Sequence, residues 1–197
     1  MIQPTHGPTN GDGGPVAQRI LKISHVFANA VRDILESRYL RETAPAPLSL
    51  SQIHLLKLID MNGDHFVGEV ADFLGVSAPA ASKNVDKLAR LDLLRRVTPE
   101  KDRRNTCLKI TAKGRDLVRR YEERRATGLR PVLETFSEEE REEFARLLTK
   151  FVTTLIDIEE QGGRGCLRCG AFYEDGCPVH GVTGRCPYEQ ARRTTKP

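Results

Sequence analysis

The stretch VADFLGVSAPAASKNVDKLAR, residues 70–90, has the pattern of two short helices joined by a tight turn. We expect the first helix over residues 67–74, and Gly75 is a natural C-terminal cap for it. Ser77 is placed to cap the second helix, and Pro79 falls in its first turn, where a missing N–H costs no hydrogen bond. The stretch therefore predicts a helix-turn-helix.

The second of these helices has two different faces. Ala81, Val85 and Leu88 recur at helical spacing and are expected to pack on the first helix. The opposite face carries Pro79, Ser82, Lys83, Asp86, Lys87 and Arg90. Small, hydroxyl-bearing and basic groups suit the major groove of a duplex, because they can reach phosphates and base edges. The residues that we expect to contact DNA are Ser77, Pro79, Ser82, Lys83 and Lys87.

A charged β-hairpin is predicted directly after these helices. Strands are expected over residues 93–98 and 106–110, joined by the polar turn PEKDRRN at residues 99–105. Arg103 and Arg104 at the hairpin tip can enter a narrow minor groove, where the negative potential is strongest. Two basic elements separated by a short strand suit a duplex better than a membrane surface.

Two helices are predicted before the helix-turn-helix. Apolar residues at helical spacing define one from about Val16 to Arg41. The next opens at Ser49, and Gln52 three residues later completes the spacing of a capping box. Residues 1–15 are rich in Gly and Pro and have no periodicity, so we expect a disordered leader there.

Two more helices are predicted after the hairpin. Thr111 caps the first, which we expect Gly128 and Pro131 to break or kink. Ser137 precedes an acidic first turn suited to the helix dipole, and an apolar stripe carries the last helix to about Gln161. The expected fold class is mainly α with a small β-hairpin wing, a winged helix-turn-helix.

Composition and charge narrow the class of protein. The chain has 197 residues and a net charge of +4, yet residues 77–120 hold 13 Lys and Arg against 5 Asp and Glu. This basic block favours a polyanion partner, with an ordinary solvated face as the alternative. No apolar run or secretory signal points to a membrane or to export, so we expect a cytoplasmic protein. No nucleophile–base pair or phosphate-binding glycine loop indicates an enzyme.

The order and spacing of these motifs resemble the MarR family of winged helix-turn-helix regulators. The resemblance rests on LSLSQ at 48–52, VADFLGVS at 70–77, ASKNVDKL at 81–88, LRR at 94–96, DRR at 102–104, LKITAKG at 108–114 and FSEEER at 136–141. It covers about residues 16–160. It implies a homodimer that binds a pseudo-palindromic operator in double-stranded DNA and regulates transcription, with repression as the expected effect.

The resemblance also assigns roles to the predicted elements. The helix that begins after Ser77 is the recognition helix, and the hairpin is the wing. The first, fifth and sixth helices form the dimer interface. Asp92 stands where the family usually has Gly, but Asp tolerates the left-handed conformation of such a turn. No Cys precedes Cys107, so peroxide sensing near the N-terminal helix is not supported, and we expect Cys107 to be a small buried hydrophobic residue.

A cysteine-rich tail, residues 162–197, follows the predicted winged-helix and dimerisation domain at 16–161. It contains CLRCG at 166–170, CPVHG at 177–181 and CPY at 186–188. Clustered thiols in a reducing compartment favour a metal over disulfides, with a switch between Cys166 and Cys169 as the alternative.

Two metal centres fit this tail. An iron–sulfur cluster such as 4Fe-4S is slightly favoured, because both later cysteines precede Pro; its ligands are Cys166, Cys169, Cys177 and Cys186. Zn2+ is the alternative, with His180 in place of Cys186.

The sequence thus predicts a DNA-binding regulator with a redox- or metal-responsive tail and a small-molecule or redox effector. The alternative is a redox or electron-transfer protein that uses the tail cluster for its chemistry and the winged helix as a scaffold for docking proteins. The basic wing discriminates between them, since a docking scaffold need not carry Arg103 and Arg104.

Overall fold

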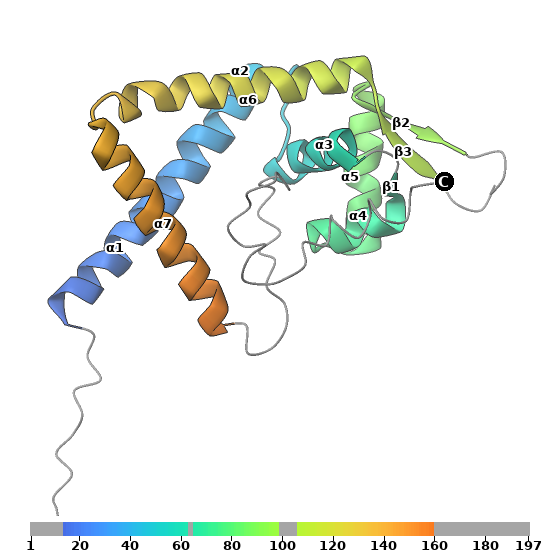
Figure 1. Cartoon of the computed structure of the whole chain (residues 1–197). Helices are drawn as coiled ribbons and strands as arrows, with labels where there is room; N and C mark the ends of the chain where they lie inside the picture. The colour runs from blue at the N-terminus through green and yellow to red at the C-terminus, as the bar shows by residue number, and fades with distance from the viewer. Residues whose placement is uncertain (1–13, 63–64, 99–105, 160–197) are drawn as a thin grey trace, which may run out of the picture.

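The computed structural model describes residues 14–62, 65–98 and 106–159. Its elements are α1 (Pro15–Ala30), η1 (Val31–Arg38), α2 (Tyr39–Thr43), α3 (Leu50–Asn62), β1 (His65–Phe66), α4 (Val67–Leu74), α5 (Ala78–Arg90), β2 (Leu94–Val97), β3 (Cys107–Ile110), α6 (Ala112–Leu133) and α7 (Glu138–Glu159). Figure 1 shows a compact part formed by α3 to β3, which we call the winged-helix lobe (residues 50–110). The long helices α1, α6 and α7 extend away from this lobe. The predicted mainly helical fold with a small β wing is confirmed.

The predicted first helix is confirmed as a continuous helical run from Pro15 to Thr43. Pro15 stands at the first helical position, where its missing N–H is not needed. The middle of the run, η1, is wound as a π-helix, and the run ends where Ala44 becomes extended before Pro45.

Side-chain caps start three of the helices, as predicted. Ser49 and Gln52 form a reciprocal capping box: the Ser49 N–H donates to Gln52 Oε1 at 3.0 Å and the Gln52 N–H donates to Ser49 Oγ at 3.3 Å. Ser137 and Glu140 form the same motif at 2.9 and 3.3 Å. Thr111 Oγ1 accepts the Gly114 N–H at 3.0 Å.

The expected break at Gly128 and Pro131 is wrong, because α6 includes both residues and ends at Leu133. Gly128 packs against Tyr39, and a Cβ at this position would lie 2.3 Å from the Tyr39 hydroxyl oxygen. Pro131 lies in the last turn, where the backbone N–H of Glu134 still reaches the Arg130 carbonyl at 2.9 Å. Tertiary packing therefore outweighs the low helix propensity of glycine here.

The predicted hairpin is confirmed and forms part of a three-stranded antiparallel sheet with the order β1-β3-β2. The short strand β1 was not predicted; its His65 pairs with Leu108, and two residues are too few for an alternating pattern. The core lies between the sheet and the surrounding helices. Its largest fully buried side chains include Leu40, Ile53, Leu56, Leu88, Leu94, Leu108, Leu117 and Tyr121.

Candidate nucleic-acid interface

The second helix of the helix-turn-helix, α5, is oriented as its sequence predicts. Ala81, Val85 and Leu88 are completely buried against the lobe. Lys83 and Arg90, on the opposite side, are exposed. Two basic side chains therefore lie on the outer face of α5, where a polyanion can reach them.

The turn into α5 leaves a polar group at the helix start. Gly75 has a φ of 63°, which allows the Val76 N–H to reach the Ala71 carbonyl at 3.1 Å. Ser77 occupies the N-cap position, but its hydroxyl makes no capping hydrogen bond, so the predicted side-chain cap is absent. Ser77 and Pro79 are exposed at the end of the helix that would approach a ligand.

Polar contacts tie both borders of α5 to the rest of the lobe. On one border, Asn84 Oδ1 accepts a 3.0 Å hydrogen bond from Gln52 Nε2 on α3. Lys87 Nζ on the same border donates to the Pro47 carbonyl at 2.5 Å. On the other border, Asp86 pairs with Arg96 of β2 at 2.8 Å. Lys87, predicted to contact DNA, is thus engaged within the protein in this structure.

The connection from α5 to the wing depends on Asp92. Its φ of 58° is left-handed, as expected for the position where the resembled family usually has Gly. This conformation lets the Leu93 N–H reach the Leu88 carbonyl at 3.0 Å, and the Asp92 carbonyl accepts Thr111 Oγ1 at 2.7 Å. The wing strands then pair from Leu94 opposite Ile110 to Val97 opposite Cys107, which is buried as predicted.

Several predicted site residues lie outside the described residues. Arg103 and Arg104 fall in the gap at 99–105, and the tail begins beyond residue 159. Its predicted metal ligands Cys166, Cys169, Cys177, Cys186 and His180 are therefore not described. Within the described ranges, no group of three or more His, Cys, Asp or Glu side chains could hold a metal ion.

A cluster of charged residues inside the protein was not predicted. Lys57 of α3 is only 3% exposed and forms an ion pair with Glu122 of α6. Arg125, also on α6, pairs with Glu122 at 3.1 Å and with Glu36 of η1 at 3.9 Å. The cluster joins the winged-helix lobe to α6 and η1. The sequence contains one signal of this cluster, because Lys57 is the one charged residue within the apolar run 53–59.

Burial shifts the pKa values of ionisable groups in and around this cluster. Desolvation, together with the positive charges of Lys57 and Arg125, lowers the pKa of His54 from 6.5 to about 4. Desolvation also lowers the pKa of Lys57, although Glu122 opposes the shift, and raises the pKa of Glu36. The Tyr121 hydroxyl and the Arg125 Nε are buried without a hydrogen-bond partner among the described residues.

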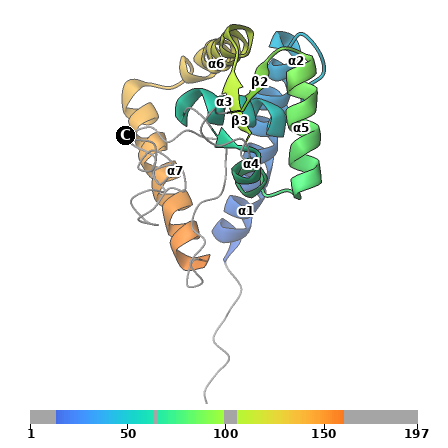
Figure 2. The ribbon, with the colours of Figure 1, turned by 90° about the vertical axis from the view of Figure 1, so that its right-hand side faces the viewer.

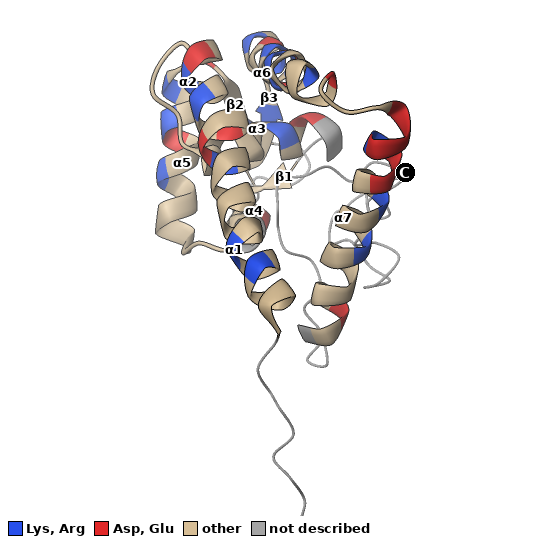
Figure 3. Ribbon diagram, turned by 90° about the vertical axis from the view of Figure 1, so that its left-hand side faces the viewer, with Lys and Arg blue, Asp and Glu red and all other residues tan. Residues whose placement is uncertain are grey.

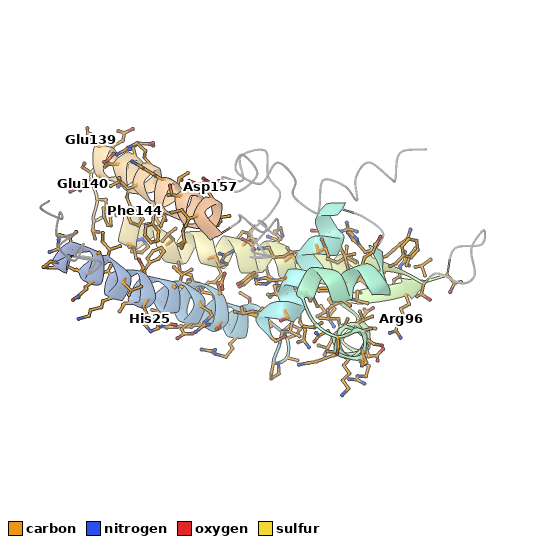
Figure 4. The ribbon with its side chains drawn as sticks, turned by 90° about the horizontal axis from the view of Figure 1, so that it is seen from below. His25, Arg96, Glu139, Glu140, Phe144 and Asp157 are labelled. Atoms are coloured by element: carbon orange, nitrogen blue, oxygen red, sulfur yellow. The ribbon has the colours of Figure 1, made fainter. Side chains whose placement is uncertain are left out.

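The long helices expose a large amount of apolar surface. Phe27 of α1 and Phe144 of α7 make an edge-to-face contact with ring centroids 6.3 Å apart, and Figure 4 shows Phe144 between the two helices. Even so, Phe151 is 43% exposed and Ile158 is 65% exposed. The other large apolar residues exposed on α1 and α7 are Val16, Ile20, Leu21, Ile23, Val26, Phe27, Phe144, Leu147 and Leu155. This surface is much more apolar than a soluble monomer usually tolerates.

The apolar helices and the basic helix lie in different parts of the protein. Figure 2 shows α5 and α7 on opposite sides of the molecule. Acidic residues gather at the start of α7, as Figure 3 shows, and these are Glu138, Glu139 and Glu140. A polyanion would therefore be repelled from this end of α7 and attracted to α5. No helix in the described part of the chain is long and apolar enough to cross a membrane.

Comparison with known proteins agrees with this geometry. A model of the MarR family matches residues 46–105, which include the helix-turn-helix and the first wing strand, β2. No curated protein sequence matches the chain.

Solved structures match a larger share of the chain. A MarR family protein from Bacillus stearothermophilus is 28% identical, with 71% of this chain and 94% of that chain covered and a TM-score of 0.57. FabT from Streptococcus pneumoniae, solved in complex with DNA, is 26% identical, with 72% and 99% covered and a TM-score of 0.59. RV1404 from Mycobacterium tuberculosis shares the fold at 23% identity, with 70% and 93% covered and a TM-score of 0.60.

Proposed function

We propose that the chain belongs to the MarR family, whose model matches residues 46–105, and that it regulates transcription by binding an operator in double-stranded DNA as a homodimer. The orientation of α5 carries this proposal: its apolar face is buried, and Lys83 and Arg90 are exposed on the opposite face. The similar FabT protein was solved with DNA. Binding at an operator excludes other proteins from it, so repression is the expected effect.

The exposed apolar residues of α1 and α7 support the homodimer. A second copy of the chain would cover them with an identical surface, as two-fold symmetry requires. Two copies would also present two α5 helices to a duplex, so the operator should contain two half-sites about one helical turn apart.

Selection of DNA from a random-sequence library tests the proposal. The wild-type protein should enrich a pseudo-palindromic duplex, and affinity for this duplex should fall steeply with salt. A double variant, Arg103→Ala with Arg104→Ala, should bind more weakly and lower the salt slope by about one unit for each lost phosphate contact.

A charge-matched control separates this effect from general electrostatics. Lys22→Ala with Lys150→Ala removes the same charge from exposed positions on α1 and α7, helices that lie away from α5 in Figure 1, and should leave the salt slope nearly unchanged. Failure of the wild type to enrich any sequence would contradict the proposed function. If the Arg103→Ala, Arg104→Ala variant binds as tightly as the wild type, only the proposed role of the wing is contradicted.

A metal centre in the C-terminal tail is the second part of the proposal. The clustering of Cys166, Cys169, Cys177 and Cys186 supports it, and the tail directly follows α7. An iron–sulfur cluster is the preferred centre and Zn2+, with His180, the alternative. Since α7 belongs to the proposed dimer interface, loading of the tail would change the relative orientation of the two α5 helices.

Spectroscopy and DNA binding test the tail together. Anaerobically purified protein should absorb broadly near 400 nm if it holds an iron–sulfur cluster, whereas a colourless protein with bound zinc supports the alternative. A Cys166→Ser, Cys169→Ser variant should differ from the loaded wild type in operator affinity at equal salt. Metal-free protein with unchanged affinity would contradict this part of the proposal.

A further inference from the structure

We propose that Gln52 is a positioning residue for DNA recognition, because its hydrogen bond to Asn84 fixes the rotation of α5 about the helix axis. This inference rests on the proposed function, in which α5 enters a DNA groove. Gln52 itself is only 6% exposed, so it acts through α5 and not by contact with DNA.

Both ends of the Gln52 amide have a partner. Its Oε1 accepts the Ser49 N–H at 3.0 Å, and its Nε2 donates to Asn84 Oδ1 at 3.0 Å. Rotation of the amide by half a turn would place Nε2 against the Ser49 N–H, so two donors would face each other. The capping box of α3 therefore holds the donor that Asn84 uses.

The position of Asn84 on α5 gives this bond its effect. Asn84 lies at the border between the buried face, with Ala81 and Val85, and the exposed face. Apolar contacts are non-directional and permit a helix to roll, whereas a hydrogen bond weakens steeply when its geometry changes. On the other border the Asp86–Arg96 ion pair opposes rolling in the opposite sense.

The rotation of α5 decides where its outer side chains meet a base pair. A helix with its side chains has a radius of about 5–6 Å, so a roll of about 20° moves its outer surface by about 2 Å. That displacement breaks a hydrogen bond between Lys83 and a base edge. Contacts with phosphates survive it better, because they depend on charge and less on direction. Loss of the Gln52–Asn84 bond should thus reduce sequence selectivity more than affinity for DNA in general.

The test uses the duplex enriched by the wild type and a scrambled duplex of equal length, at equal salt. Gln52→Met and Asn84→Ala should each lower affinity for the enriched duplex about tenfold, as expected for one partly buried hydrogen bond. Affinity for the scrambled duplex should change less than about twofold. The double variant should lose no more than either single variant, because both remove the same bond.

Two further variants separate positioning from a structural role. Ser49→Ala removes a cap of α3 and keeps the Gln52–Asn84 bond, so it should lower the melting temperature and retain selectivity. Asn84→Asp keeps an acceptor for Gln52 Nε2. It should weaken binding to both duplexes and preserve the ratio of the two affinities. This variant still tests the inference if Gln52→Met fails to fold.

Three results would overturn the inference. One is unchanged selectivity in Asn84→Ala or in folded Gln52→Met. Another is a double variant whose loss of affinity for the enriched duplex equals the product of the two single losses, which would mean that Asn84 acts directly on DNA. The third is a loss of selectivity in Asn84→Asp equal to that in Asn84→Ala. Lack of any enriched duplex for the wild type would instead contradict the proposed function.

Discussion

Lys57 of α3 and Glu122 of α6 form an ion pair in which the lysine side chain is almost fully buried. The pair links the winged-helix lobe to the helix that leads toward α7. Burial of an ammonium group is costly, so this link depends on the presence of the carboxylate.

Loss of Glu122 should therefore destabilise the protein more than loss of Lys57. Glu122→Gln leaves the buried ammonium without this carboxylate and should lower the free energy of unfolding by about 3 kcal/mol. Lys57→Met removes the buried charge and keeps most of the side-chain volume, so a change of only about 1 kcal/mol is expected. Urea denaturation measures both values.

A neighbouring residue provides the matched control. Glu123→Gln removes an exposed carboxylate paired with Arg119 at 2.8 Å and should cost less than about 1 kcal/mol. Equal losses in the Glu122 and Glu123 variants would show that burial of Lys57 carries no special cost.

His54 should make stability depend on pH below neutrality. Its pKa is about 4 in the folded protein and 6.5 in the unfolded chain, so the unfolded state binds more protons between these values. The contribution of neutral His54 to stability is complete above pH 6.5 and is lost as the pH falls toward 4. Between pH 7.5 and 4, the wild type should lose about 3 kcal/mol relative to His54→Gln. Urea denaturation at a series of pH values measures the difference, and parallel curves would contradict it.

Lys83 is predicted to read a base from the exposed face of α5. Lys83→Ala should cost about 1–3 kcal/mol with the enriched duplex and relax specificity at one position of each half-site. Selection repeated with the variant measures this change. If affinity falls equally for all duplexes, Lys83 contacts a phosphate only.

The exposed stripe of α7 should control the oligomeric state. Leu147→Glu places a charge within the apolar surface and should shift the dimer toward monomer at micromolar concentration in light scattering. Thr149→Glu adds the same charge on another face of α7 and should leave the dimer intact. A monomeric wild type, or equal effects of the two substitutions, would argue against this interface.

Gly114→Ala should destabilise the protein although alanine favours helices. A Cβ at this position would lie 2.0 Å from the Leu93 carbonyl oxygen, which also accepts the Thr111 N–H at 3.2 Å. Helix propensity alone predicts a gain of about 1 kcal/mol. The close contact with the Leu93 carbonyl outweighs this gain. We therefore expect the free energy of unfolding to fall by about 1–3 kcal/mol, as measured by thermal denaturation. Ala126→Gly, at an exposed position of α6, measures propensity alone.

The sequence predicted the local features of the fold and of the candidate site. Ser49, Thr111 and Ser137 mark helix starts because a cap joins residues only three positions apart. The buried and exposed faces of α5 follow from the helical spacing of Ala81, Val85 and Leu88 in the same way.

Only the tertiary structure decided how distant residues meet. Gly128 stays inside α6 because the Tyr39 ring occupies the space beside it, and no local pattern indicates that neighbour. Likewise, Gln52 and Asn84 lie 32 residues apart in the chain, and their bond forms only once α3 packs beside α5. Caps and periodicity act within one helix turn or along one helix, and the sequence therefore determines them by itself. The burial of Lys57 and the rotation of α5 depend on contacts between different elements. These elements are far apart in the sequence and meet only in the folded protein.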